Sequence, residues 1–255
     1  MQTISAMINT YNEEKNITDC LQSLQWVDEL VVVDSGSTDK TVDLARRYAH
    51  KVESVPSGDF SEIRNAGLQY VTGDWVLIVD ADERVTSDLQ AEIKGLISGD
   101  PKEVGFFIPR KNLFMGYWIR NCGWYPDYVL RLFRNSPQHR FSGRVHESVL
   151  LNGTTNKLRQ PLIHYTYESL EQYLNKFNRY TTLAAEMMYE KGRKANWMHL
   201  CIRPLVEFIK MFVFKTGFKD GFYGLMIACM SSMYIFVKFA KLWLRQERWF
   251  REGKS

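Results

Sequence analysis

The sequence predicts an α/β fold in which a mainly parallel, Rossmann-like sheet carries helices on both faces. Over the first hundred residues, short apolar runs alternate with segments of helical periodicity. Two of the runs, Leu30 to Val33 and Trp75 to Val79, are almost wholly apolar, which is typical of strands buried on both faces. Polar clusters follow the strands at 10–14, 34–39 and 80–83. Ligands bind beyond the carboxyl ends of strands in such sheets, so these clusters predict the functional site.

The elements expected within residues 1–100 follow from this alternation. We expect strands at 4–8, 30–33, 51–55 and 75–79, with helices at 14–26, around 42–45, at 60–71 and at 86–97. Ser37 or Thr38 is the expected N-cap of the second helix and Thr86 that of the fourth, because a hydroxyl oxygen can accept a backbone N–H there. This order of strands and helices is that of a doubly wound sheet.

Beyond residue 100 the pattern changes. Residues 105–109 and 128–133 are expected strands, and 169–191 is an expected long amphipathic helix. The segment 113–126 is rich in aromatic residues, which indicates either a loop over a site or a small aromatic core. We therefore expect three regions: one half of the sheet domain at 1–100, its second half at 101–168, and a helical region at 169–255.

The helical region is expected to associate with a membrane. The 16 residues from Phe222 to Val237 carry no charge, and basic stretches at 191–194 and 238–254 flank the apolar segments. Spanning a bilayer takes about 20 apolar residues, so we expect two helices lying in the membrane interface, or a shallow re-entrant pair. A packed hydrophobic hairpin and a true span are the alternatives. The basic fringe suits an anionic membrane face.

Composition narrows the class of protein. Hydrophobic residues make up 45% of the chain and charged residues 24%, as in ordinary folded domains. The four cysteines form no C-x-x-C pair, and the first ten residues lack a basic start and a cleavage site. We therefore expect a protein of the reducing cytoplasm that contacts the cytoplasmic face of a membrane. The net charge of +4 is weak evidence for any partner, and no nucleic-acid partner is expected.

Acidic residues follow two of the buried strands. Asp80 and Asp82 lie two residues apart, where one carboxylate can reach a ribose and the other a divalent cation. Asp34 ends another strand, where it can accept a hydrogen bond from a base or a ribose hydroxyl. Mg²⁺ and Mn²⁺ prefer hard oxygen ligands and bridge them to phosphates. The pattern therefore predicts a nucleotide site with a cation that neutralises a departing diphosphate.

Three further side chains fit a nucleotide ligand. Tyr11 can lie against a flat base and Glu13 can bond a ribose. Arg64 can meet a diphosphate oxygen, because a guanidinium pairs well with phosphate. An arginine on a helix surface is the alternative for Arg64.

Three motifs, Thr10-Tyr11-Asn12-Glu13-Glu14, Val33 to Asp39 and Asp80-Ala81-Asp82-Glu83, together resemble those of family 2 inverting glycosyltransferases of the GT-A fold. The resemblance implies a nucleotide-sugar donor, usually linked to UDP, and a divalent cation, Mg²⁺ or Mn²⁺. By this match Thr10 belongs to the nucleotide-binding motif, Asp34 holds the base, Asp80 holds the ribose and Asp82 binds the metal.

The second half of the chain is similar to a bacterial subgroup that includes lipopolysaccharide inner-core β-1,4-glucosyltransferases. The matching segments are 124–127, 131–133, 145–147, 164–165 and 217–221. The similarity implies transfer of a hexose, glucose from UDP-glucose, to a membrane glycolipid such as the lipopolysaccharide inner core. A polyprenyl-phosphate or protein glycosyltransferase is the alternative, and a nucleotidyltransferase or a non-catalytic sugar-nucleotide-binding module is the alternative of another class.

An inverting transfer needs one general base that removes the proton of the acceptor hydroxyl. Glu147 and Asp127 are the candidates, with a salt bridge to Arg144 or Arg131 as the alternative for Glu147. His164 can complete the metal shell, because imidazole suits manganese, and a hydrogen-bonded core histidine is its alternative.

Overall fold

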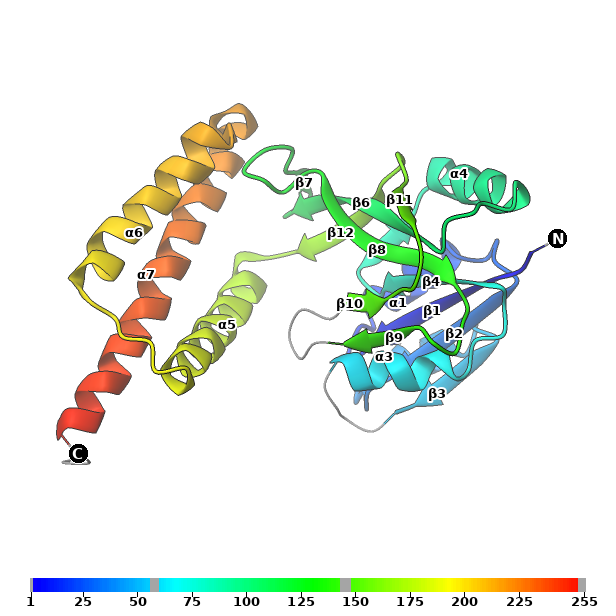
Figure 1. Cartoon of the computed structure of the whole chain (residues 1–255), viewed down its shortest axis with the longest axis horizontal. Coiled ribbons are helices and arrows are strands. Elements are labelled where there is room, and N and C mark those ends of the chain that lie inside the picture. The colour runs from blue at the N-terminus through cyan, green and yellow to red at the C-terminus, as the bar shows by residue number, and fades with distance from the viewer. Residues whose placement is uncertain (1, 56–59, 143–147, 252–255) are drawn as a thin grey trace. The chain divides into compact units, whose positions relative to one another are not determined.

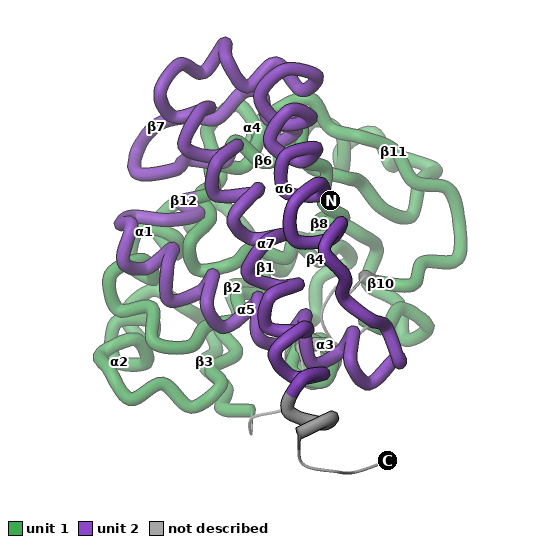
Figure 2. The backbone as a smooth tube through the Cα atoms, turned by 90° about the vertical axis from the view of Figure 1, so that its left-hand side faces the viewer, with its two compact units in different colours: residues 1–111, 126–164 green, residues 112–125, 165–255 purple. Residues whose placement is uncertain are grey.

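The computed structural model describes residues 2–55, 60–142 and 148–251. The chain forms two compact units, coloured separately in Figure 2. Unit 1 comprises Met1–Lys111 and Pro126–His164, and unit 2 comprises Asn112–Tyr125 and Tyr165–Ser255. The division into regions 1–100, 101–168 and 169–255 stays a prediction.

Four parallel strands form the first half of the predicted sheet, and this part of the fold prediction is confirmed. They lie in the order β3-β2-β1-β4 and are β1 (Ile4–Thr10), β2 (Glu29–Asp34), β3 (Lys51–Ser54) and β4 (Trp75–Asp80). The side chains of β1, β2 and β4 are almost entirely buried, as expected for strands covered on both faces, whereas those of the edge strand β3 are partly exposed. In the register of the sheet, Thr10 lies opposite Asp34, and Asn9 lies opposite Asp80.

Antiparallel strands extend the sheet beyond β4 in the order β8-β6-β12-β5. They are β8 (Asp127–Arg134), β6 (Gly105–Phe114), β12 (Leu162–Tyr167) and β5 (Glu83–Val85). The short strands β7 (Tyr117–Trp118) and β11 (Thr155–Lys157) pair with β6, and β9 (Arg140–Ser142) pairs with β10 (Ser148–Leu150). Figure 1 shows β8 beside β4 and the β9–β10 pair beside α3.

Helices pack on both faces of the sheet, and the first and third of them are shorter than the apolar periodicity predicts. They are α1 (Ile17–Gln22), α2 (Thr41–Ala45), α3 (Phe60–Leu68) and α4 (Ser87–Ser98). Helices α1, α2 and α4 contribute to one core cluster, and α3 with β9 and β10 contributes to the cluster on the other face. The predicted cap Thr86 is confirmed, because its side chain accepts the N–H of Leu89.

The predicted cap of the second helix is wrong. The N-cap of α2 is Lys40, which makes no side-chain capping bond. The hydroxyl of Ser37 is instead hydrogen-bonded to the carboxylate of Asp34, and Thr38 donates its N–H to Asn12. Asp39 accepts the N–H and the hydroxyl hydrogen of Thr41, so the helix begins after an aspartate turn.

Unit 2 is helical. Its elements are α5 (Leu170–Glu190), α6 (Trp197–Ile209), a π-helical turn η1 (Lys210–Phe214), a 3₁₀ turn η2 (Gly217–Asp220) and α7 (Gly221–Arg251). Helix α6 lies beside the first part of α7, and α5 also packs against α7 (Figure 1). Among the described residues, α7 is one helix that is long and apolar enough to cross a membrane by length and composition.

The aromatic segment before β8 contributes to a core of unit 2. Phe114, Ile119 and Cys122 are at most 1% exposed and belong to one apolar cluster with Met211 and Ile227. The ring of Phe114 makes edge contacts with three neighbouring aromatic rings, those of Trp124, Tyr167 and Tyr173. The aromatic-core alternative thus describes the buried part of this segment.

Candidate functional site

Three of the predicted site residues end adjacent parallel strands of unit 1. Thr10 ends β1, Asp34 ends β2 and Asp80 ends β4, and β1 lies between the other two. Thr10 and Asp34 are 4% and 3% exposed. The structure therefore brings these polar groups to one edge of the sheet, where the topology of parallel strands places ligands.

The carboxylate of Asp34 holds the loop that follows it. One of its oxygens accepts the N–H groups of Gly36 and Ser37 at 2.9 Å, and the other accepts the Ser37 hydroxyl. Gly36 has a φ of +92°, which favours glycine over residues with a side chain. Asp34 is thus buried, and hydrogen bonds from its own loop hold its carboxylate in place.

A second loop lies against this one and carries Tyr11. Asn12 and Glu13 donate their N–H groups to the hydroxyls of Ser37 and Thr41, both at 2.8 Å. Glu13 accepts a hydrogen bond from the side chain of Asn16 at 2.9 Å. The ring of Tyr11 remains 59% exposed beside these bonds, so a flat surface is available at the edge of the sheet.

Asp80 lies between two arginines. One of its oxygens is 2.9 Å from Arg64, and the other contacts Arg131 more closely. Burial disfavours the charged form of Asp80, but the charges of Arg131 and Arg64 outweigh it and hold the pKa of this carboxyl well below its usual range. Arg64 is 8% exposed and points inward from α3, so it is not a surface arginine.

Alternating charges continue from Asp80 across the sheet. Arg131 also contacts Glu83 at 2.8 Å, and Arg110 contacts Glu83 at 3.6 Å and Asp127 at 2.6 Å. Together with Arg64 these residues form a row of three arginines and three carboxylates, which we call the charge row: Arg64, Asp80, Arg131, Glu83, Arg110 and Asp127. Glu83 is fully buried, and Arg131 is 4% exposed.

The charge row was largely missed by sequence reasoning, although one signal was present. Asp127 and Arg131 lie four residues apart in the sequence, and residues at this spacing share a face of a regular strand. Burial disfavours the cation of Arg131, but the charges of Asp80 and Glu83 prevail and raise its pKa above the usual range. The side chain of Arg131 is thereby held as a cation between Asp80 and Glu83.

Asp82 and His164 form the predicted metal pair. Nε2 of His164 lies 3.5 Å from Oδ2 of Asp82, and both side chains are partly exposed, by 14% and 22%. His164 lies opposite Glu83 in the register of β12 and β5, which sets its ring beside the loop that carries Asp82. Two adjacent donors, one oxygen and one nitrogen, fit a manganese ion better than magnesium, which prefers oxygen alone.

Two protein donors alone do not complete a metal shell. Within residues 2–55, 60–142 and 148–251 there is no group of three or more His, Cys, Asp or Glu side chains that could hold a metal ion. The pair therefore fits a cation whose remaining ligands come from a diphosphate and water, which is the usual arrangement for magnesium or manganese with nucleotides.

The structure describes one of the two candidate bases. Asp127 begins β8, and one oxygen of its carboxylate accepts hydrogen bonds from Nε and a terminal nitrogen of Arg110 at 2.9 and 2.6 Å. Glu147 lies outside the described residues, as do its predicted alternative partner Arg144 and the motif residue His146.

Two buried polar side chains, those of Asn9 and Thr10, lie at the same edge of the sheet. Sequence reasoning missed Asn9 and assigned Thr10 only by motif. The side-chain oxygen and nitrogen of Asn9 and the hydroxyl of Thr10 are buried and make no hydrogen bond to the described part of the protein. Buried polar groups are rarely left unpaired, so these atoms indicate a place for a ligand or ordered water beside Asp34 and Asp80.

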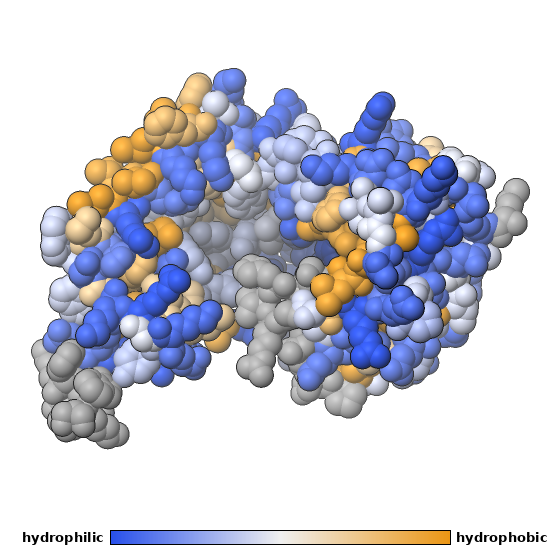
Figure 3. Space-filling model, viewed as in Figure 1, coloured by the Kyte–Doolittle hydropathy of each residue, from blue (hydrophilic) through white to orange (hydrophobic). Residues whose placement is uncertain are grey.

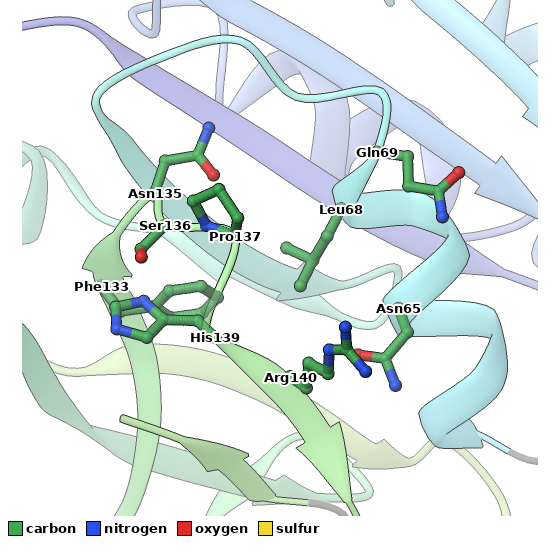
Figure 4. A pocket seen from close by; sticks show the side chains of 9 residues that line it. All are labelled: Asn65, Leu68, Gln69, Phe133, Asn135, Ser136, Pro137, His139 and Arg140. Atoms are coloured by element: carbon green, nitrogen blue, oxygen red, sulfur yellow. The ribbon is translucent and has the colours of Figure 1, made fainter. Parts of the chain in front are cut away.

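A cavity of about 690 Å³ lies elsewhere in unit 1 (Figure 4). It is lined by α3 residues such as Asn65 and Leu68 and by the segment after β8, including Asn135 and His139. Asn135 donates to the carbonyl of Gly73, just before β4 begins, so the cavity lies toward the opposite ends of the strands. None of the predicted site residues that the structure describes lines it.

Comparisons with known proteins agree with this geometry. Residues 5–185 match the model of the family described as "Glycosyl transferase family 2". The chain is 28% identical to the lipopolysaccharide core biosynthesis glycosyltransferase LpsC of Rhizobium meliloti, over 95% of this chain and 92% of LpsC. It is also 28% identical to an uncharacterised glycosyltransferase of Rickettsia typhi, over 95% and 87% of the two chains.

A solved structure shares the fold. The crystal structure of residues 1–349 of S. aureus TarS, in complex with UDP-GlcNAc, superposes with a TM-score of 0.51 over 98% of this chain and 92% of that chain, at 17% identity. This likeness agrees with the predicted GT-A fold. Because the family match covers well over half of the residues, the chain belongs to glycosyl transferase family 2 and is a glycosyltransferase.

Proposed function

We propose that this enzyme transfers a hexose, glucose from UDP-glucose, to a membrane glycolipid of the lipopolysaccharide core type, with inversion at the anomeric carbon. The observation that carries the proposal is the meeting of Asp34, Asp80 and the Asp82–His164 pair around the carboxyl ends of β1, β2 and β4. The acceptor class is supported by the name of the Rhizobium relative, which this chain matches over nearly its whole length.

The donor nucleotide would lie across the ends of β1 and β2. The exposed ring of Tyr11 stacks on the base, and the buried carboxylate of Asp34 accepts its imide N–H. Asp80, Thr10 and Glu13 face the ribose. Arg64 can share its guanidinium between Asp80 and a diphosphate oxygen, since it presents several donors in one plane.

A divalent cation fits between Asp82, His164 and the diphosphate. When bound, it supplies positive charge to the diphosphate that leaves. The protein's part is to hold the two donor side chains in place, which β5 and β12 do by pairing directly behind them.

The acceptor hydroxyl would lose its proton to Asp127 or Glu147 as its oxygen attacks the anomeric carbon. A single base on the acceptor side, with the leaving diphosphate on the other side of the sugar, gives inversion. Arg110 holds the carboxylate of Asp127 in one orientation, which suits a positioned base. We propose contact with the cytoplasmic face of the bacterial inner membrane, because a glycolipid acceptor is anchored there.

The test is turnover of purified protein with a panel of UDP-sugars and a defined core glycolipid, with and without Mn²⁺. UDP-glucose should release UDP and form a β-linked product. Asp82→Asn should lower kcat about a hundredfold. Asp19→Asn, a carboxylate with a 72% exposed side chain on α1, is the matched control and should keep full activity.

Other outcomes discriminate the alternatives. Release of diphosphate from a nucleoside triphosphate would indicate a nucleotidyltransferase and overturn the proposal. Transfer to polyprenyl phosphate or to a peptide, but not to the core glycolipid, would keep the glycosyltransferase and replace its acceptor. Comparing Glu147→Gln with Asp127→Asn assigns the base, since the base variant alone should lose the rise of kcat with pH on the acid side of the pH–kcat profile.

A further inference from the structure

The outer face of α6 is apolar although it faces solvent. Six side chains recur at helical spacing on this face and continue into η1, and we call them the α6 stripe: Met198, Ile202, Leu205, Ile209, Val213 and Phe214. Their exposure runs from 39% at Ile209 to 79% at Phe214. The opposite face of α6, with Pro204 and Phe208, packs inside unit 2. Figure 3 shows hydrophobic residues gathered along the outer side of this helix.

Such a face is uncommon on a protein surrounded by water. A row of exposed large apolar side chains generally marks an interaction surface. Here the row is about four turns of helix long, and polar side chains such as Arg203, Glu207 and Lys210 flank it. An apolar stripe with charged flanks is typical of helices that lie in a membrane interface.

The charges beside the stripe favour an anionic surface. Between Trp197 and Asp220 there are four cationic side chains, Arg203, Lys210, Lys215 and Lys219, all of them exposed. The two acidic residues of this stretch are neutralised or withdrawn. Glu207 is paired with Lys210 at 3.2 Å, and Asp220 is 4% exposed and accepts the N–H of Asn121 at 2.8 Å.

Polar contacts argue that α7 lies along the membrane and does not cross it. Nζ of Lys241 lies within 2.9 Å of four oxygen atoms of α5, which belong to Asn178, Thr181 and Thr182. Arg245 contacts Glu186 of α5 at 3.0 Å. If α7 spanned a bilayer, the polar surface of α5 that packs beside it would enter hydrocarbon, at a cost of several kcal/mol for each charged side chain placed there.

We infer that the α6 stripe is the membrane-docking surface of this glycosyltransferase, inserted parallel to an anionic lipid bilayer with Lys210, Lys215 and Lys219 at the headgroups. This inference rests on the proposed function in one respect: a lipid-anchored acceptor is the reason for the enzyme to work at a bilayer. The docking surface is confined to unit 2, whereas the donor residues are in unit 1.

The test is flotation of the purified full chain with vesicles of phosphatidylcholine, alone or mixed with phosphatidylglycerol. Wild type should bind the mixed vesicles and hardly bind the neutral ones. Leu205→Gln should weaken binding about tenfold, because one half-inserted leucine contributes on the order of 1.4 kcal/mol. The matched control is Leu174→Gln on α5, a leucine of 47% exposure that should bind as wild type does.

A second variant tests the charges. Lys215→Gln combined with Lys219→Gln should reduce the preference for anionic vesicles about tenfold or more, since each lysine near such a surface contributes about 1 kcal/mol. The double variant should also bind the neutral vesicles no more weakly than wild type does.

Four results would overturn the inference. The first is equal binding of the wild-type protein to both kinds of vesicle, and the second is an equal loss of binding in Leu205→Gln and Leu174→Gln. The third is a dimer in solution that Leu205→Gln disrupts. The fourth is that a variant with both Leu205 and Ile209 replaced by Gln is still extracted from membranes only by detergent. Binding of UDP by the same variants, measured by titration calorimetry without vesicles, separates this question from the donor site. Absence of UDP binding by the wild-type protein would instead count against the proposed function.

Discussion

The charge row predicts that one buried carboxylate has a large effect on stability. Glu83→Gln keeps the shape of the side chain and removes its charge. Glu83 is completely buried, accepts Arg131 at 2.8 Å and accepts the backbone N–H of Asp80 at 3.0 Å. Removing one partner of a buried ion pair typically costs 3–5 kcal/mol, and an amide oxygen can still accept one hydrogen bond, so we expect a loss of about 3 kcal/mol.

Urea unfolding followed by circular dichroism measures this loss. With a slope near 3 kcal/mol per M, the midpoint should fall by about 1 M. Asp19→Asn is the control in the same unit, because Asp19 also faces an arginine, Arg84, at 3.9 Å, but its side chain is 72% exposed. Its effect should stay within about 1 kcal/mol. A Glu83→Gln midpoint equal to that of Asp19→Asn would show that the charge row does not stabilise the fold and would refute this reasoning.

Three further predictions concern the metal pair, acid sensitivity and helix packing. His164→Ala should weaken activation by Mn²⁺ more than activation by Mg²⁺, because it removes a nitrogen donor. Titration of each metal against kcat measures this difference, and an equal loss of activation with both ions would exclude His164 as a ligand. Burial opposes the charged form of Glu29, but hydrogen bonds from Lys51, Ser5 and Thr72 prevail and lower its pKa to about 2. Its stabilisation is present above the unfolded pKa of about 4.3 and lost as the pH falls toward 2, so Glu29→Gln should flatten that part of the stability–pH curve and leave the neutral side unchanged in slope. Gly224→Ala should destabilise unit 2, because a Cβ there would lie 1.8 Å from the carbonyl oxygen of Gly217, whereas Gly95→Ala on α4 meets nothing within 4 Å and should raise the melting temperature.

The parallel half of the fold could be predicted because its strands are strongly apolar and local. The runs ending at Val33 and Val79 are too apolar for exposed strands, and each is followed by a helical period. Helix α1 was predicted too long for a definite reason. Its apolar spacing continues through Leu24 and Val27, which are buried, but the backbone there forms hydrogen bonds between residues three apart and is a series of turns. Apolar periodicity indicates which side chains are buried, but it does not indicate which hydrogen bonds the backbone makes.

The antiparallel strands were harder to predict. β5 and β11 have three residues each, and Thr155–Lys157 is exposed and polar, so neither shows an apolar alternation. β6 was predicted to end at Pro109 but continues to Phe114, where its pairing with β7 belongs to unit 2. Short polar strands are held by their neighbours, and a neighbour that is distant in sequence leaves no local signal.

The same limit applies to the candidate site. The positions of Asp34, Asp80 and Asp82 follow from strand ends and could be predicted from topology. The pairing of Asp80 with Arg131 joins residues 51 positions apart, and it depends on the antiparallel register of β4 and β8. The individual roles of the nucleotide, metal and base residues stay predictions.

Unit 2 is built from two separate stretches of chain, and this limits how the enzyme can be shortened. Phe114, Ile119 and Cys122 precede β8, yet Met211 and Ile227 from far later in the chain belong to the same buried cluster. A truncated protein that stops before α6 would keep those three residues and lose part of their cover. Removing the C-terminal helices to obtain a soluble catalytic fragment should therefore produce aggregation, and single exposed residues of α6 are the better targets for improving solubility.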